Sequence, residues 1–426
     1  MHLPEIHPHW YSENFLINNR VEKHIMEQKK IVITDTGTIS PLGTDLSMVS
    51  ASLSQVPQLS SIQSFEFHEF DKALPCRLLD NFDPVKILGK KGLRNKDKAT
   101  KMLLCAFEKG FKTTIEESDE NTRPGICIGT AFGSVQSIGD FLSDSIESGV
   151  NSVNPQAFAN TVINAPTGNA NIRYAVRNLS TTVSTGFNSS LDAFIYSYDF
   201  IRQGYIDRII TGGLEEVSYY SLLGFMRSGL LSLSGSIRPF IAANSDGIIP
   251  GEGCALYSVE TIESAQKRKA PVIAEIAGCS NGFDPSLAKN RISDGTVFRR
   301  VVEQTCALAG VSFDDIDFIA SGASGNPVSD AAEATGIASL FGIDTPVTAY
   351  KSFTGECYGA SGALMILCAL SDMANNRITG IPGDSYPVIN SINPVFGVME
   401  KESSKVLVTS VSCDGNCSAI LLSTDN

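Results

Sequence analysis

The side chains that could act as a nucleophile or a general base are distributed unevenly along this chain of 426 residues. All five histidines lie at or before residue 68, so the segment from residue 69 to residue 426 contains none. A serine or cysteine nucleophile ordinarily needs a base positioned beside it. The long histidine-free segment therefore argues against a histidine-dependent catalytic site in the main body of the chain.

The ten cysteines are scattered and include no CxxC pair. Most of them lie in apolar stretches of sequence, which favours reduced thiols over disulfides or a zinc site. We therefore expect a cytoplasmic protein without a bound metal or other cofactor.

The most informative stretch for local structure is LSTTVSTGFNSSLDAFIYSYDFIRQGYIDRIITGGLEE. It predicts a strand over residues 180–185, a tight turn over 186–188, a helix over 189–203 and a strand over 208–212. Ser189 or Ser190 can cap this helix at its N-terminus.

The length of the chain exceeds the usual limit for a single core. We predict an α/β protein with an N-terminal extension over residues 1–28 and two similar halves over residues 29–271 and 272–426. The segment VIAEIAGCSNGF, which opens the second half, loosely repeats the first predicted strand, IVITDTGTIS.

Composition narrows the classes of partner. The net charge of −13 argues against nucleic acid or an anionic membrane as the main partner. No apolar run reaches the roughly 18–20 residues that a membrane-spanning helix needs, and the first fifteen residues lack the pattern of a signal peptide.

Seven segments, in this order, resemble motifs of the β-ketoacyl synthases of fatty-acid and polyketide assembly. They are ITDTGTISPLG, LGKKGLRNKDKAT, TVSTGFNSSLDAF, TGGLEE, RPFIAANSDGIIPGEG, GNPVSDAAEA and KSFTGECYGASGA. The resemblance implies the thiolase fold, with two pseudo-repeated halves in a layered αβαβα arrangement.

Three positions that carry the family's chemistry have changed. The family's cysteine nucleophile, in a motif like TACSSGLDA, corresponds to Phe187, and a benzyl group cannot hold a thioester. The family's two histidines, in runs like AHGTGTPLND and KSMTGHTLGAAG, correspond to Gly322 and Glu356. Those imidazoles stabilise the developing enolate, which a carboxylate would repel.

Other family positions are kept. Asp330, Glu333 and Lys351 match its supporting residues, whereas the glycine-rich run GFGGTN has become SCDGNC, with Cys413 at its gating phenylalanine. This pattern is similar to chain length factors, the non-catalytic subunits of type II polyketide synthases. The resemblance implies a heterodimer with an active ketosynthase-α subunit, joined through the strand at Leu179–Thr185.

The resemblance also implies where a substrate tunnel and a carrier protein would lie. The helix after the GTAFGS turn supplies Gln136, Gly139 and Phe141 as candidates for the residues that line and close the tunnel. Chain length factors of the aromatic-polyketide type usually carry glutamine where this chain has Phe187, so we expect a divergent branch.

Two basic runs are candidate docking sites for an acidic acyl carrier protein, although a solvated loop is an equal alternative. Their side chains are Lys90, Lys91, Arg94, Lys267, Arg268 and Lys269.

Two other functions remain open from the sequence. The first is an acyltransferase that uses Ser189 or Ser190 in place of the lost cysteine, with Glu356 as its base. The second is a homodimeric protein that binds acyl chains or regulates a synthase.

Overall fold

The computed structural model describes residues 29–424, apart from residues 58–59, 66–67, 117–122, 243–244, 246, 290 and 390–391. The extension predicted for residues 1–28 lies outside the described residues. Within the described part, the chain forms one large mixed sheet, two small two-stranded sheets and the helices that cover them.

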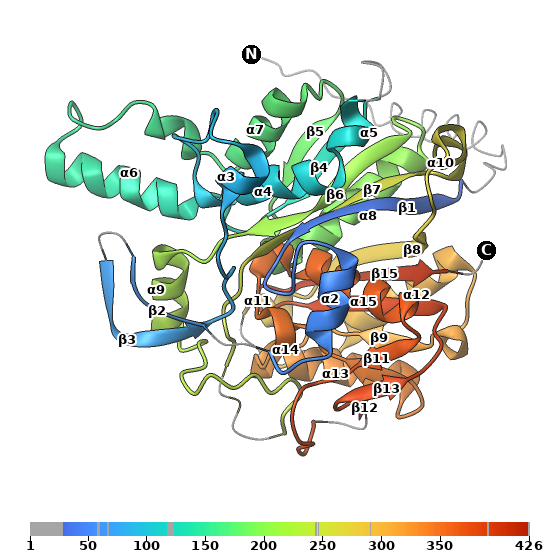
Figure 1. Ribbon diagram of the computed structural model, residues 1–426. Coiled ribbons are helices and arrows are strands. Elements are labelled where there is room, and N and C mark those ends of the chain that lie inside the picture. The colour runs from blue at the N-terminus through green and yellow to red at the C-terminus, as the bar shows by residue number, and fades with distance from the viewer. Residues whose placement is uncertain are drawn as a thin grey trace, which may run out of the picture.

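The large sheet has eleven strands in the spatial order β12-β10-β9-β14-β15-β8-β1-β7-β6-β4-β5. Strand β1 meets β8 in its middle through a short antiparallel pairing. Figure 1 shows the half that contains β1 above the half that contains β8. The strands are β1 (Ile31–Ile39), β4 (Gly125–Gly129), β5 (Ser180–Val183), β6 (Arg208–Glu215), β7 (Gly253–Thr261), β8 (Ala274–Phe283), β9 (Phe318–Ala320), β10 (Pro346–Thr348), β12 (Asn393–Pro394), β14 (Lys405–Val411) and β15 (Asn416–Ser423).

The two halves of this sheet repeat each other. The first half reads β5-β4-β6-β7-β1 and the second reads β10-β9-β14-β15-β8, so corresponding strands occupy corresponding places. The directions also agree: in each half three neighbouring strands are parallel, the fourth is antiparallel to the third, and the fifth is antiparallel to the fourth. The predicted duplicated α/β fold is confirmed, while the exact boundary at residues 271 and 272 stays a prediction.

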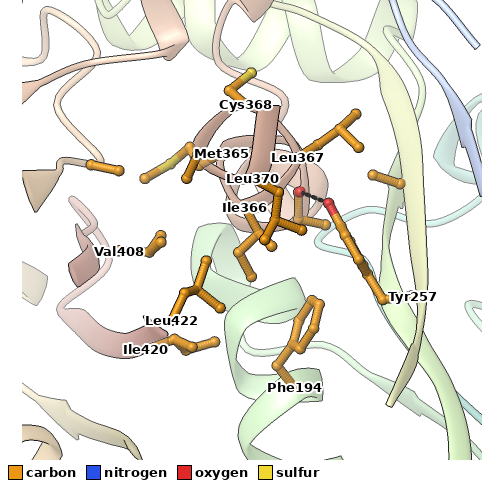
Figure 2. Close-up of a cluster of buried hydrophobic side chains, with 14 of the residues drawn as sticks. Phe194, Tyr257, Met365, Ile366, Leu367, Cys368, Leu370, Val408, Ile420 and Leu422 are labelled. Carbon is orange, nitrogen blue, oxygen red and sulfur yellow. Dashed lines mark hydrogen bonds between the residues drawn. The ribbon is translucent and has the colours of Figure 1, made fainter. Parts of the chain in front are cut away.

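Two buried helices form the central layer between the half-sheets. They are α8 (Ser189–Arg202) and α15 (Ser361–Ala374), and every residue of α15 up to Met373 is buried. Figure 2 shows α15 with Phe194 of α8 and with apolar side chains of strands from both halves. The phenol of Tyr257 on β7 donates to the Ala363 carbonyl at 2.6 Å.

The outer faces of the half-sheets carry two further layers of helices. Helices α4 (Lys98–Gly110) and α7 (Ala165–Tyr174) cover the first half, and α12 (Thr296–Ala309) and α13 (Pro327–Phe341) cover the second. Alternate residues of a strand point to opposite faces of the sheet, so each half-sheet contributes side chains to the central core and to one outer core. The predicted αβαβα layering is confirmed.

The remaining elements are short or stand away from these layers. In Figure 1 helix α6 projects to one side, and the β2–β3 hairpin and α9 lie below it. These elements are α2 (Leu46–Leu53), α3 (Pro84–Leu88), α5 (Lys112–Glu116), α6 (Val135–Ser148), α9 (Tyr219–Ser228), α10 (Ile262–Arg268), α11 (Pro285–Ala288), α14 (Lys351–Thr354), the 3₁₀ turns η3 (Ala157–Asn160), η4 (Gly186–Asn188), η5 (Phe313–Asp315) and η6 (Tyr358–Ala360), and the paired strands β2 (Ser60–Phe65) with β3 (His68–Cys76) and β11 (Arg377–Thr379) with β13 (Val398–Glu400).

The strand–turn–helix–strand segment follows the prediction closely. The predicted strand, turn and helix correspond to β5, η4 and α8 within two residues at each end. Strand β6 runs three residues past the predicted end because the GLE of TGGLEE continues to pair with β7. No helix among the described residues is long and apolar enough to cross a membrane.

Candidate functional site

The candidate site lies where the turns η4 and η6 meet at the start of the two central helices. Phe187 occupies η4 and is half-buried. Its ring centroid lies 5.3 Å from that of Tyr358, 5.8 Å from that of Phe225 and 6.5 Å from that of Phe132, each in an edge-to-face arrangement. We call these four residues the aromatic cluster. Such contacts stabilise the rings beyond simple burial, so the position expected for a nucleophile serves as packing.

The backbone N–H of Phe187 is already bound to a carboxylate of the chain. It donates to Asp414 Oδ2 at 3.1 Å, and Asp414 lies in the turn between β14 and β15. Asn416, the first residue of β15, donates its side-chain amide to the Thr185 carbonyl. Free N–H groups at the start of a helix can stabilise an oxyanion. In this chain the N–H group of Phe187 donates to the Asp414 carboxylate instead.

Gly186 explains how Asp414 can come so close. The residue has φ of +82°, and a Cβ added to it would lie 1.8 Å from Asp414 Oδ2. A glycine is therefore required there both by the backbone conformation and by the approach of the carboxylate.

Glu356 forms a buried ion pair with Lys351. Lys351 Nζ lies 2.8 Å from Glu356 Oε2, and the two side chains are only 3% and 2% exposed. The other oxygen, Oε1, accepts from the Tyr358 N–H at 3.0 Å and from Ser361 Oγ at 2.6 Å. A buried carboxylate needs such partners. Both oxygens of Glu356 are thus bound by groups of the same chain.

Gly322 has no room for a side chain. A Cβ added there would lie 2.6 Å from Ser410 Oγ and 2.8 Å from Ser410 Cα. Ser410 cannot move easily, because it is on β14 and its Oγ donates to Asn188 Oδ1 at 2.8 Å. A histidine at residue 322 would require the strand to shift.

The three retained residues are all buried and support the loops around these positions. Asp330 accepts the N–H groups of Phe240, Ser324 and Gly325 at 2.9–3.1 Å, and burial raises its pKa to about 6. Glu333 accepts from the Gly322 N–H and from Thr409 Oγ1. Burial raises the pKa of Glu333 to about 7.

Sequence reasoning noted TGGLEE but gave Glu215 no role. This carboxylate is fully buried and accepts from the N–H groups of Ala131, Phe132 and Gly359, as well as from Thr130 Oγ1. It therefore ties the loop after β4 to η6 beneath the aromatic cluster. Burial raises the pKa of Glu215 to about 7. The two adjacent glutamates at the end of a buried strand were the available signal in the sequence.

Ser189 and Ser190 are both fully buried. Ser189 Oγ donates to the Gly186 carbonyl at 2.5 Å and accepts from the Thr185 N–H at 3.0 Å. Ser190 Oγ accepts from the Ala363 N–H at 3.0 Å, which joins α8 to α15. Both hydroxyl groups stabilise backbone groups, and Glu356 bonds to neither of them in the contacts described above.

The tunnel candidates lie on α6, which has no buried residue. Gln136 Oε1 accepts from the Tyr219 N–H at 2.8 Å, and Tyr220 packs so closely on Gly139 that an added Cβ would lie 1.9 Å from its ring. The Phe141 ring lies 5.9 Å from that of Phe158. These residues thus attach the projecting helix to α9 and η3.

The docking candidates fall into two separate groups. Lys90, Lys91 and Arg94 are exposed between α3 and α4, and Lys267 and Lys269 are exposed at the end of α10. Figure 1 shows α3 and α10 well apart across the upper half of the molecule.

Arg268 differs from the other docking candidates. Its guanidinium forms ion pairs with Asp35 at 2.6 Å and with Glu260 at 2.7 Å. Its charge is therefore largely balanced within the chain. Among the described residues, no three His, Cys, Asp or Glu side chains gather to hold a metal ion.

Family models match most of the chain. The N-terminal domain of β-ketoacyl synthases matches residues 28–265, and the C-terminal domain matches residues 273–381. The chain belongs to the β-ketoacyl synthase family. Among curated members, it is 27% identical to 3-oxoacyl-[acyl-carrier-protein] synthase 2 of Coxiella burnetii over 384 residues, which cover 87% of this chain and 91% of that protein. The corresponding synthase of Staphylococcus aureus strain COL is 26% identical over 86% of this chain and 89% of its own length.

Solved structures of this family share the fold. The ishigamide ketosynthase/chain length factor superposes with a TM-score of 0.84 at 22% identity, over 94% of this chain and 100% of that chain. A ketosynthase (ApeO) in complex with its chain length factor (ApeC) from Xenorhabdus doucetiae superposes with a TM-score of 0.79 at 19% identity, over 93% of this chain and 98% of that chain. These matches bear out the thiolase fold implied by the sequence motifs.

Proposed function

We propose that this chain is a non-catalytic chain length factor that pairs with an active ketosynthase and shapes the tunnel for a carrier-protein-bound polyketide. One observation carries the proposal: every position that would perform the condensation is used for structure. Phe187 packs in the aromatic cluster, Gly322 lies against Ser410, and Glu356 is paired with Lys351.

The contact between Asp414 and the Phe187 N–H supports the same conclusion. A condensing enzyme needs free donors where an oxyanion develops in the transition state. In this chain a carboxylate accepts from that donor, and its negative charge would repel an oxyanion. Restoring a cysteine alone would thus leave the site without its electrostatic support.

The edge of the sheet supports pairing with another subunit. Strand β5 ends the eleven-stranded sheet and is bonded on one side to β4. An open edge presents unpaired N–H and C=O groups to a second strand. The nearby segment from α6 to α7 carries several exposed apolar side chains. The similarity to solved assemblies of a ketosynthase with a chain length factor favours a ketosynthase as the partner.

Under this proposal, α6 reaches into the partner and Gln136, Gly139 and Phe141 bound the far end of the tunnel. The projecting position of α6, without a buried residue of its own, favours a role at a subunit interface. Lys90, Lys91 and Arg94 are the more favourable docking group for an acidic carrier protein. Arg268 is less suitable because Asp35 and Glu260 neutralise it.

The acyltransferase alternative has weaker support. Ser189 and Ser190 are fully buried and hold backbone groups, and the candidate base Glu356 is held by Lys351, Tyr358 and Ser361. A serine without a base has little nucleophilic strength at neutral pH. Intact mass after incubation with an acyl-loaded carrier protein tests it directly, because an adduct on either serine would support the alternative.

The test of the main proposal is the native mass of the chain, expressed alone and together with an intact ketosynthase encoded near it. We expect a one-to-one complex that forms on co-expression, and polyketide synthesis by the complex but not by either chain alone. A matched control replaces the ketosynthase cysteine, which should abolish synthesis and keep the complex. A stable homodimer that does not bind the ketosynthase would refute the proposal.

A further inference from the structure

Three buried oxygen atoms near the starts of helices α4 and α6 have no hydrogen-bond partner among the described residues. They are Glu216 Oε1, Ser134 Oγ and Thr100 Oγ1. Glu216 is 3% exposed, and Ser134 and Thr100 are completely buried. Buried polar side-chain atoms in native proteins nearly always have a partner, so each exception calls for an explanation.

The side chains of Glu216 and Thr100 meet where the end of β6 lies against the start of α4. Glu216, the residue after β6, accepts the Ala99 N–H through Oε2 at 3.0 Å. Thr100 is the next residue of α4, and its own N–H donates to Asp97 Oδ1 at 2.8 Å. The other oxygen of Asp97 accepts from Ser137 Oγ of α6 at 3.4 Å, so the start of α6 reaches the same place.

Ser134 belongs to this junction because of its position on α6. It is the N-cap of the helix and lies one turn before Ser137, so both hydroxyl groups are on the face that meets Asp97. Its Oγ does not cap the helix. Glu215 and Glu216 serve different layers, since Glu215 accepts from Gly359 in η6 whereas Glu216 accepts from α4. We call the meeting point of β6, α4 and α6 the polar junction.

The polar junction carries more negative than positive charge. Its carboxylates are Asp97, Glu216 and Glu252, and Lys98 Nζ lies 2.6 Å from both oxygens of Glu252. Lys98 is therefore committed to Glu252. The N-termini of α4 and α6 offset roughly half of the charge that Asp97 and Glu216 carry together. Burial, followed by the charge of Asp97, raises the pKa of Glu216 well above its ordinary value.

Three kinds of group could complete the polar junction, and they differ in what they satisfy. A proton on Glu216 would neutralise the carboxylate but would leave the hydroxyl groups of Ser134 and Thr100 without a partner. A water molecule would give the three oxygens a partner but would leave the buried charge, which is unfavourable. A cation does both, because carboxylate and hydroxyl oxygens are hard ligands that suit hard cations.

We propose that Glu216 Oε1, Ser134 Oγ and Thr100 Oγ1 bind a monovalent cation, sodium or potassium, at the polar junction. The charge of the donors points to a monovalent ion, because only one carboxylate oxygen is free and both oxygens of Asp97 already accept hydrogen bonds. This set differs from sites built on three His, Cys, Asp or Glu side chains, of which the described part of the chain has none.

A cation at this place would have a structural role. It would join the start of the projecting helix α6 to the outer helix α4 and to the end of β6. The inference concerns the stability of this chain and does not depend on the proposed function.

The experiment measures thermal unfolding of the purified protein in sodium chloride, potassium chloride or choline chloride. Each salt is used at about 0.2 M, so that charge screening is equal. Choline is too large to fit among three buried side chains. The variants are Glu216→Gln, which removes the charge, and Ser134→Ala, which removes one hydroxyl group and leaves the contact with Ala99. The matched control is Ser371→Ala, because Ser371 Oγ is also buried without a partner in the described structure but lies on α15.

We expect the Tm of the wild-type protein to be about 2–4 °C higher in sodium or potassium chloride than in choline chloride, because an ion that binds only the folded state stabilises it. This difference should disappear in Glu216→Gln, shrink in Ser134→Ala and persist in Ser371→Ala. Amide hydrogen exchange should locate the effect, with slower exchange of residues 97–100 and 134–138 in the stabilising salt.

Three results would overturn the inference and leave the proposed function intact. The first is a wild-type Tm that does not depend on the cation. The second is a dependence on the cation that Glu216→Gln retains in full, since the ion would then act elsewhere. The third is a wild-type Tm that ignores the cation and falls as pH rises, with Glu216→Gln lacking that fall, which would identify a proton on Glu216 instead.

Discussion

The buried pair of Lys351 and Glu356 allows a stringent test of the structural role assigned to the vestigial site. Lys351→Met would leave a carboxylate that is 2% exposed without its cation, and Glu356→Gln would leave an unpaired ammonium that is 3% exposed. Breaking such a pair by removing one partner typically costs about 3–5 kcal/mol, and we take about 4 kcal/mol as the central value. We expect the lower end, about 3 kcal/mol, for Lys351→Met, because Tyr358 and Ser361 continue to donate to Glu356.

The double variant K351M/E356Q should be more stable than either single variant. It removes both charges, keeps nearly the same side-chain volumes, and leaves an amide oxygen that can accept from Tyr358 and Ser361. Replacing a whole buried pair by neutral groups is often close to neutral, so we expect a loss of about 1 kcal/mol.

Thermal unfolding of the purified protein at one scan rate measures these differences. For a chain of this length, about 1 kcal/mol corresponds to a shift in Tm of about 1–2 °C. Lys351→Met should lose about 3–6 °C, Glu356→Gln about 4–8 °C and the double variant about 1–2 °C. Because large proteins often unfold irreversibly, only variants measured under identical conditions are compared. A double variant whose loss equals the sum of the single losses would refute the assignment.

Three further predictions concern the same region. Phe187→Cys, alone or combined with Glu356→His, should give no condensation with acyl and malonyl carrier proteins. Gly322 leaves no room for a second histidine, and Asp414 keeps its hydrogen bond to the N–H of residue 187. Measurable turnover would show that these two contacts do not prevent condensation. Gly322→Ala should destabilise the chain by about 2 kcal/mol through overpacking against Ser410. G322A/S410G should recover only part of that loss in a thermal melt, because it removes the contacts with Ser410 Oγ and Cβ but keeps the contact with the Cα of residue 410 and loses the hydrogen bond to Asn188. A Gly322→Ala chain that melts like wild type would contradict the steric reason. Burial raises the pKa of Glu333 from 4.5 to about 7 in the folded chain. Between those two pH values the folded chain binds more protons than the unfolded chain, so the contribution of Glu333 to stability falls as pH rises from about 4.5 to about 7. Glu333→Gln should therefore flatten the dependence of Tm on pH in that range, and an unchanged slope would contradict this prediction.

The fold was largely predictable from the sequence because its signals are local. The strand, turn and helix around residues 180–203 have strong periodic patterns, and their predicted limits agree with β5, η4 and α8. The duplication was a weaker inference, since VIAEIAGCSNGF only loosely resembles IVITDTGTIS. The duplication is much clearer in the strand order, which is the same in the two halves of the sheet, than in the similarity of these two segments.

The motifs indicated which residues occupy the three positions of the site, but not the contacts that those residues make. Phe187 and Asp414 are separated by 227 positions, and nothing in the run SCDGNC indicates which donor its carboxylate accepts from. The steric limit at Gly322 likewise depends on Ser410 of another strand.

Arg268 and α6 show the same difficulty for surface residues. The run QKRKAP indicates a basic patch, but only the packing shows that Asp35 and Glu260 neutralise its arginine. An amphipathic helix must bury its apolar stripe, yet the pattern does not say whether its own chain or another one covers it.

The two ends of the large sheet are unlike, and this difference limits how far assembly can proceed. At one end β5 offers a strand edge, whereas at the other β12 has two residues and one of them is Pro394, which lacks an N–H group. A sheet that could add strands at both ends would join head to tail into open filaments. If chains pair through β5 as proposed, that pairing occupies the only one of these two edges that can readily accept a strand, and the assembly would end at two chains.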